Sequence, residues 1–239
     1  MSPYLAIKNV YRAIIPQSLN RMIFDGRTRL SRVIIYLKAL IERDARHDEL
    51  YDAVYFERQR IEMVQSGRGI ADSLVERLPG LRSVVDVGCG SGAVLSELTR
   101  RGVEGVGLEY AEAALAICRE NGLNVRKFDI EAAEQPDTTA DLALSTEVAE
   151  HLPERCAEAY VDLLTSIADT VVMTAATPGQ GGTDHVNEQP NAYWIEKFAA
   201  RGFKHDHERT EEWRVDWRSR GVDRYRAKNV MIFTRDTAD

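Results

Sequence analysis

Two carboxylates and two histidines are spaced so that they could bind a metal ion. Glu147, Glu150 and His151 stand within five residues, and His185 follows in a later segment. On a helix, residues three and four positions apart share a face, so the first three side chains would converge. Carboxylate oxygens with imidazole nitrogens, and without a thiolate, suit Mg²⁺ or Mn²⁺. The pattern predicts a divalent-cation site in which His151 or His185 serves as ligand or as catalytic base.

A site without metal is the alternative for these residues. Glu147 would then cap a helix or hydrogen-bond its own loop, and His151 would be a turn residue before Leu152 and Pro153. His185 would be a surface histidine. Activity that survives a chelator would favour this alternative.

A glycine-rich segment stands earlier in the chain, with the sequence VVDVGCGSG at 84–92. Its glycines let the backbone turn tightly and approach a ligand closely, and the helix that follows offers N–H donors to an anion. Three acids end the first three expected strands, where they could accept from an ammonium group, a ribose and an adenine amine: Asp86, Glu109 and Asp129. Each acid alone fits a solvated strand end or a cap, but together they predict a nucleoside pocket.

The motifs VVDVGCGSG, GLEYAEAAL, KFDIE and ADLALSTEVAEHLP resemble, in order and spacing, those of class I S-adenosylmethionine-dependent methyltransferases. The resemblance covers most of the chain and implies S-adenosylmethionine as cofactor. It implies that Asp86 contacts the methionine part, Glu109 the ribose and Asp129 the adenine. The cofactor residues expected from it are Asp86, Gly88, Cys89, Gly90, Gly92, Glu109, Asp129, Ile130 and Thr146. A dehydrogenase fits these motifs less well.

Two shorter segments resemble narrower groups. E-V-A-E-H with a later D-H resembles metal-dependent 2′-O-methyltransferases of small-RNA 3′ ends and O-methyltransferases of ubiquinone biosynthesis. Both methylate one oxygen of a vicinal pair, which a metal can chelate. The segment R-A-I-I-P-Q-S-L-N-R resembles methyltransferases found with polysaccharide-assembly enzymes. These resemblances imply metal-assisted O-methylation of a sugar or glycan hydroxyl. The alternatives are a catechol or quinol acceptor, or a cofactor-binding partner subunit without catalysis.

Short apolar runs alternate with helical stretches after Pro79. This alternation is typical of a doubly wound α/β fold, with a mostly parallel sheet covered by helices on both faces. Seven strands are expected, the last two as an antiparallel edge: 83–88, 105–109, 125–129, 141–146, 170–176, 203–210 and 230–234. Neighbouring parallel strands end at one edge, so His185 would reach the segment that holds Glu147.

Residues 1–80 show helical apolar spacing throughout and predict a helical cap or lid on a cofactor-binding domain of residues 81–239. Tyr55 in the cap, and Tyr193 and Trp194 after the His185 loop, are candidates for contacts with the acceptor. Core aromatics are the alternative for each of them.

The tail places Trp213 and Trp217 four residues apart, among several arginines. One interpretation is a helix that buries both tryptophans and exposes its arginines. The other is a pair of stacking surfaces for sugar rings, with arginines that donate to hydroxyl or acid groups.

Charge and composition limit the partners. The chain has a net charge of −7, which argues against nucleic acid and leaves a small-molecule or oligosaccharide acceptor. Residues 1–41 are basic and amphipathic, which predicts a homodimer face or a packed helix, with peripheral contact to an anionic membrane as the alternative. No apolar run is long enough for a transmembrane helix. The three cysteines suggest no disulfide framework, so we expect a cytoplasmic protein.

Overall fold

The computed structural model describes residues 43–44, 47–48, 50–133 and 135–236. The basic segment 1–41, with the predicted dimer face or membrane contact, lies outside the described residues. One compact unit begins at Tyr51 and contains all the elements described below.

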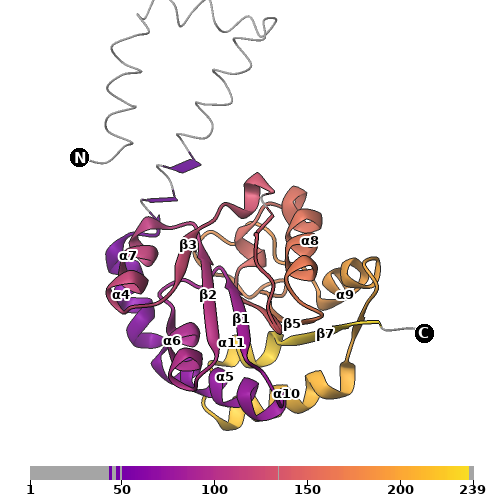
Figure 1. Ribbon diagram of the computed structural model, residues 1–239. Coiled ribbons are helices and arrows are strands. Elements are labelled where there is room, and N and C mark those ends of the chain that lie inside the picture. The colour runs from indigo at the N-terminus through magenta and orange to yellow at the C-terminus, as the bar shows by residue number, and fades with distance from the viewer. Residues whose placement is uncertain (1–42, 45–46, 49, 134, 237–239) are drawn as a thin grey trace, which may run out of the picture. The chain divides into compact units, whose positions relative to one another are not determined.

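A seven-stranded sheet forms the centre of this unit (Figure 1), with the strand order β3-β2-β1-β4-β5-β7-β6. The first five strands in the chain are parallel, and β7 is antiparallel to both of its neighbours. The strands are β1 (Ser83–Val87), β2 (Glu104–Glu109), β3 (Val125–Lys127), β4 (Leu142–Thr146), β5 (Thr170–Thr174), β6 (Phe203–His205) and β7 (Met231–Arg235). The doubly wound sheet with an antiparallel edge is therefore confirmed.

Among the strands that are shorter than expected, β3 and β6 end early because acids cap the elements that follow them. Asp129 caps the 3₁₀ turn η1 (Ile130–Ala132), so β3 ends at Lys127. The side chain of Asp206 accepts from the backbone N–H of Arg209 and starts a helix where the strand was expected to continue. Residues 207–210 are therefore helical.

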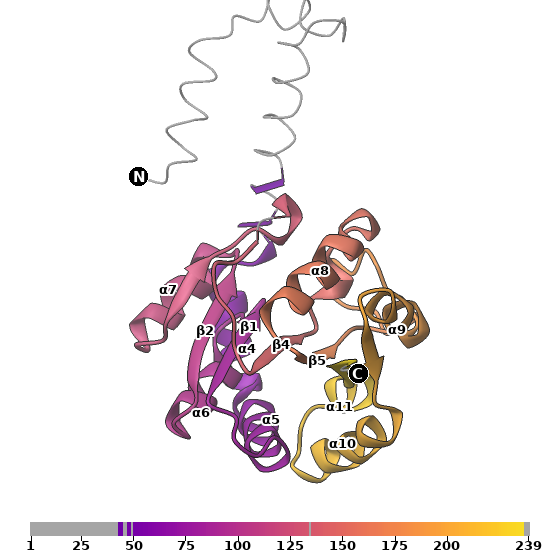
Figure 2. The same ribbon diagram turned by 45° about the vertical axis from the view of Figure 1, so that its right-hand side comes forward.

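Helices cover both faces of the sheet (Figures 1 and 2). One face packs against α5 (Val64–Arg77), α6 (Ala93–Arg100) and α10 (His207–Ser219), and the other packs against α8 (Ala157–Ile167) and α9 (Asn191–Ala199). The short 3₁₀ turn η3 (Glu154–Cys156) precedes α8. Both faces bury apolar side chains, as expected for strands covered on two sides.

Trp213 and Trp217 lie on the buried side of α10. Both side chains are fully buried, and the indole N–H of Trp217 donates to the Ser73 hydroxyl on α5 at 3.1 Å. The interpretation as stacking surfaces for sugar rings is wrong for these two residues, because neither ring is accessible to a ligand.

The two described helices of the predicted cap, α4 and α5, belong to the same compact unit as the sheet. Helix α5 buries Ile70, Ala71 and Leu74 in the same core as the sheet, so it is one of the layers that cover the strands. Helix α4 (Ala53–Glu62) lies beside α7 (Glu112–Glu120), where Phe56 packs against Ala111 and Ala114. The compact unit consequently starts at Tyr51 and not at residue 81.

A second short helix, α11 (Arg224–Asn229), follows α10 and leads into β7. Asp223 caps it by accepting from two backbone N–H groups. Met231 of β7 pairs with Met173 near the end of β5, so α11 ends at the carboxyl edge of the sheet. Among the described helices, none is long and apolar enough to span a bilayer.

Candidate functional site

The glycine loop after β1 has the backbone form that only glycine adopts easily. Gly88, Gly90 and Gly92 have φ values of 73°, 54° and 73°. A Cβ atom at Gly88 would lie 2.4 Å from a methyl carbon of Val148. The N–H of Gly88 donates to the carbonyl of Leu108 at 2.8 Å, which fixes the loop against β2. The loop is thus a tight, rigid turn at the carboxyl edge.

Glu109 ends β2 and points its carboxylate at this loop. One oxygen accepts from the N–H of Gly90 at 2.8 Å, and the other accepts from Tyr110 at 2.7 Å and Ala111 at 2.8 Å. Burial raises the pKa of Glu109, and the three N–H donors oppose this rise. The carboxylate is held in one orientation, and its remaining lone pairs can accept from hydroxyl groups.

Asp86 is a buried carboxylate on β1, two residues before the loop. Burial raises its pKa to about 7, and the nearby charge of Glu109 adds to the rise. A cationic ligand beside Asp86 would reverse this effect, because an opposite charge favours the ionised form. An ammonium group is such a ligand.

The other expected cofactor residues lie along the same edge. Asp129 accepts from the N–H groups of Glu131 and Ala132, at 3.0 and 3.3 Å, so it does cap the turn η1. Ile130 opens that turn, and Thr146 ends β4. The thiol of Cys89 lies within the loop, 3.9 Å from the carbonyl oxygen of Gly90.

Helix α4 reaches the glycine loop through a residue that the sequence did not single out. The side-chain carbonyl of Gln59 accepts from the N–H of Ser91 at 3.2 Å. A Cβ atom at Gly90 would lie 2.8 Å from that same oxygen. Nothing in the spacing of Gln59 distinguishes it from an exposed helix residue. Its contact depends on how α4 packs over the loop.

Glu150, His151 and His185 come together as the metal hypothesis requires. Their possible ligand atoms all lie within 4.8 Å of one another. Glu150 is fully buried, and its carboxylate oxygens make no well-aligned hydrogen bond within the described residues, although the backbone N–H groups of Glu150 and Ala176 lie close enough to lower its pKa. An orphaned buried carboxylate is costly, and a bound cation would satisfy it.

Both imidazoles are oriented by a hydrogen bond to one ring nitrogen. The Nδ1 atom of His151 lies 3.0 Å from the Tyr51 hydroxyl, and that of His185 lies 2.8 Å from a carboxylate oxygen of Glu188. These bonds leave Nε2 of each ring for another partner. Metal-binding histidines are commonly oriented in this way.

Burial dominates the electrostatics of the cluster. It raises the pKa of Glu150 to about 8, with a further rise from the charge of Glu147, and it lowers the pKa of His151, with a further fall from His185. The metal-free site therefore favours a protonated carboxyl and a neutral imidazole. A divalent cation would stabilise the carboxylate and the neutral ring together.

Glu147 lies outside this cluster, so the prediction of one shared helical face is wrong. Residues Ala149–His151 form a single 3₁₀ turn, η2, and Glu147 precedes it with a left-handed φ of 54°. One carboxylate oxygen of Glu147 accepts from the side-chain amide of Gln180 at 2.7 Å. Backbone hydrogen bonds hold His185 next to the cluster, because the N–H groups of the two residues that follow it, Val186 and Asn187, donate to the Glu150 carbonyl.

The three aromatic candidates for acceptor contacts differ in their surroundings. Tyr55 is half-buried on α4 and interacts electrostatically with Glu109 and Glu150. Trp194 is 1% exposed and packs against Tyr160, so its assignment as an acceptor contact is wrong. Tyr193 packs beneath the Lys197 ammonium group at 4.5 Å and makes an edge-to-face contact with Trp194.

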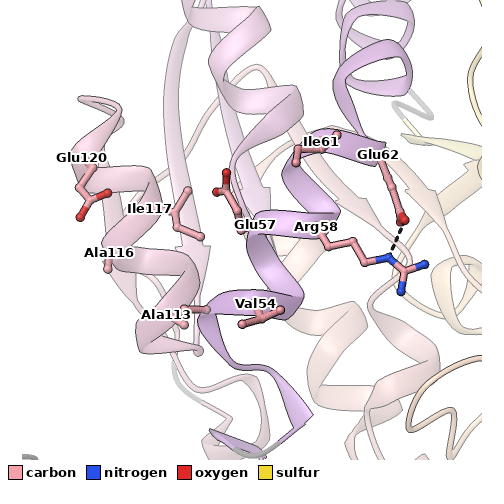
Figure 3. Close-up of a pocket in the computed structure, with 10 residues that line it drawn as sticks. Val54, Glu57, Arg58, Ile61, Glu62, Ala113, Ala116, Ile117 and Glu120 are labelled. Atoms are coloured by element: carbon pink, nitrogen blue, oxygen red, sulfur yellow. Dashed lines mark hydrogen bonds and ion pairs between the residues drawn. The ribbon is translucent and has the colours of Figure 1, made fainter.

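An apolar groove of about 720 Å³ lies elsewhere, between α4 and α7 (Figure 3). Val54, Ile61 and Ile117 line it, and an ion pair between Arg58 and Glu62 borders it. Neither the glycine loop nor the metal cluster contributes to its lining. The groove therefore does not belong to the candidate site.

The comparisons with known proteins agree with the cofactor half of this site. Residues 85–166, which include the glycine loop and the Glu150 segment, match the family model described as a methyltransferase domain. The prediction of a methyltransferase from the motifs is confirmed at the level of this domain.

Curated relatives share part of their length with this chain. A ubiquinone biosynthesis O-methyltransferase of Hahella chejuensis is 38% identical over 84 residues, which cover 32% of this chain and 35% of that protein. One of Pseudomonas fluorescens is 29% identical over 119 residues, or 47% of each chain. The chain thus matches between about a third and a half of the length of these relatives.

Solved structures confirm the fold. The magnesium protoporphyrin IX methyltransferase of Synechocystis with bound SAH aligns with a TM-score of 0.57 and 18% identity, over 74% of this chain and 84% of that one. An amino pentose methyltransferase of Micromonospora echinaspora with bound SAM aligns with a TM-score of 0.58 and 19% identity, over 77% and 98%. At these identities the likeness concerns the fold alone.

Proposed function

We propose that this chain transfers a methyl group from S-adenosylmethionine to a hydroxyl group of a small molecule. The arrangement of Glu109 at the glycine loop, 2.8 Å from the Gly90 N–H, inside a methyltransferase domain, supports this most directly. S-adenosylmethionine supplies a methyl group on a positively charged sulfur when it is bound. Glu109 would accept from its ribose hydroxyls, and Asp86 would pair with its ammonium group.

A divalent cation is the second part of the proposal. The orphaned carboxylate of Glu150 and the oriented imidazoles of His151 and His185 fit Mg²⁺ or Mn²⁺. Such an ion lowers the energetic cost of an alkoxide at a hydroxyl that it binds. Nε2 of one histidine would ligate the ion, and the other histidine would be free to accept the acceptor's proton.

The acceptor is proposed to be a sugar or glycan with two adjacent hydroxyl groups. A vicinal pair would chelate the cation and present one oxygen to the methyl group. A catechol or quinol is the second candidate, and it is favoured by the name of the curated relatives, ubiquinone biosynthesis O-methyltransferases. Both candidates share the vicinal oxygens that the cluster would bind.

Turnover with matched acceptors tests this function. The purified chain is incubated with S-adenosylmethionine, Mg²⁺ and either a sugar vicinal diol or a catechol, and the formation of S-adenosylhomocysteine (SAH) is measured. We expect turnover with compounds that carry two adjacent free hydroxyl groups. We expect none with either of the two monomethyl ethers, in which one of these oxygens already carries a methyl group. Excess chelator should stop turnover, and Mg²⁺ or Mn²⁺ should restore it. Binding of SAH without turnover on any acceptor would favour the non-catalytic partner subunit.

Three further expectations stay predictions. A cytoplasmic location, a homodimer and a peripheral membrane contact through residues 1–41 depend on parts of the chain or on surroundings that the structure does not describe. Sedimentation of the full chain with and without these residues would test the homodimer.

A further inference from the structure

Arg226 brings a positive charge to the acceptor side of the site. It lies on α11, which contacts β5 and ends where β7 begins. Asn229, one turn further along the same helix, donates to the side-chain carbonyl of Gln180 at 2.7 Å, in the loop after β5 that also holds His185. The cofactor residues Glu109 and Asp129, in contrast, come from β2 and from the segment after β3. Helix α11 therefore borders the half of the edge where the acceptor would bind.

The guanidinium group of Arg226 has donors without acceptors. One terminal nitrogen pairs at 3.0 Å with the carboxylate of Asp223, the residue that caps the helix. Its Nε atom is buried and makes no hydrogen bond to any described residue. The side chain is 17% exposed, so water satisfies little of it. A buried donor without a partner costs stability unless a ligand supplies the acceptor.

The positive charge of Arg226 acts on two other groups of the site. Burial raises the pKa of Asp86 and of Tyr55, and the charge of Arg226 opposes the rise in both cases. Asp86 lies on β1, and Tyr55 lies on α4, the helix that contacts the glycine loop; α11 ends at the same carboxyl edge of the sheet. Asp223, the residue that caps α11, is the ion-pair partner of Arg226.

We propose that Arg226 binds a carboxylate group of the acceptor, so that the substrate is an acidic sugar or an acidic phenol. This proposal rests on the function proposed above and narrows its substrate class. A guanidinium group donates two parallel hydrogen bonds to a carboxylate, and a neutral acceptor would leave its Nε donor unsatisfied. The surrounding acids would repel an anionic acceptor elsewhere in the site, so Arg226 also fixes its orientation.

Pairs of compounds that differ by one carboxylate test the proposal. Binding of glucuronate and glucose, and of protocatechuate and catechol, is measured by calorimetry on the full chain saturated with SAH and Mg²⁺. For the wild type we expect the acidic member of at least one pair to bind about tenfold more tightly or better, as for charged hydrogen bonds. Arg226→Met should abolish that preference. Arg224→Met, an exposed arginine on the same helix, is the matched control and should keep it.

Other outcomes would overturn the proposal. Equal binding within both pairs by the wild type would do so, as would a preference that persists in Arg226→Met. A loss of SAH affinity in Arg226→Met, with unchanged affinity for methylthioadenosine, would show that Arg226 holds the cofactor's own carboxylate. If Arg226→Met fails to fold by circular dichroism, Arg226→Lys keeps the charge without the paired donors, and the preference should fall about tenfold. Absence of SAH binding by the wild type would instead contradict the proposed function.

Discussion

Glu150 is a fully buried carboxylate without a side-chain hydrogen-bond partner among the described residues. If it binds a cation in this cluster, Glu150→Gln should abolish Mn²⁺ binding, measured by electron paramagnetic resonance. Glu147→Gln is the matched control, because Glu147 contacts Gln180 and lies outside the cluster. We expect it to retain the ion. Equal Mn²⁺ binding by wild type and Glu150→Gln would contradict the metal site.

Asp86 predicts a pH dependence of stability. Burial raises its pKa from 3.8 to about 7, so between these values the folded chain binds a proton that the unfolded chain has released. The free energy of unfolding should therefore fall as pH rises through this window. Asp86→Asn should flatten this fall by an amount on the order of a few kcal/mol. Urea unfolding of the ligand-free proteins at pH 5 and pH 8 measures this change in the free energy of unfolding. An equal change in the wild type and in Asp86→Asn would contradict the raised pKa of Asp86.

Some site residues can be predicted from their spacing in the sequence, and others depend on how distant segments pack. Gly88, Glu109 and Asp86 occupy positions fixed by the end of a strand, so their spacing is enough to predict that they lie at the carboxyl edge of the sheet. The expected position of Glu147 is wrong because its own left-handed backbone changes the direction of the chain just before the turn η2. Its side chain therefore does not share a face with those of Glu150 and His151. Arg226 depends on packing between segments far apart in the chain, which no local spacing shows.

Substitutions on helix α10 test whether its tryptophans belong to the core. Trp217 is fully buried and donates to Ser73 of α5. Trp217→Ala should lower the free energy of unfolding by about 3–5 kcal/mol, the usual cost of removing a buried aromatic side chain. Val215→Ala, on the exposed side of the same helix, should change it by less than about 0.5 kcal/mol.

Chemical denaturation measures both variants. A Trp217→Ala protein of unchanged stability would show that this face of α10 is not packed as described. Helices and strands can be predicted from the sequence where their apolar spacing is regular, as in β1 and α8. Their boundaries cannot be predicted in this way where a capping residue decides them. Asp206, for example, starts α10 where a strand was expected to continue.

The compact unit that starts at Tyr51 makes a prediction for the whole molecule. A chain of residues 51–239 should unfold cooperatively and bind SAH. A chain of residues 81–239 lacks α5, whose buried residues Ile70 and Leu74 complete one face of the core, and should not fold. Circular dichroism during thermal unfolding checks both. Cooperative unfolding of residues 81–239 would restore the boundary expected from the sequence.

The architecture was the most predictable level, because alternating strands and helices leave few arrangements of a covered parallel sheet. The boundary of the cap was less predictable, since a helix that covers the sheet and a helix that caps the site have the same amphipathic pattern. Helices α4 and α5 illustrate this, as one contacts the glycine loop and the other the core.

Calorimetric titration with SAH tests whether the glycine loop and Glu109 bind the methyl donor. We predict saturable binding with one site per chain. In Glu109→Ala the affinity should fall by about 1.5–3 kcal/mol, since the variant loses charged hydrogen bonds to the ribose and to the loop. A wild-type chain that binds no SAH, or a folded Glu109→Ala variant with unchanged affinity, would contradict the account.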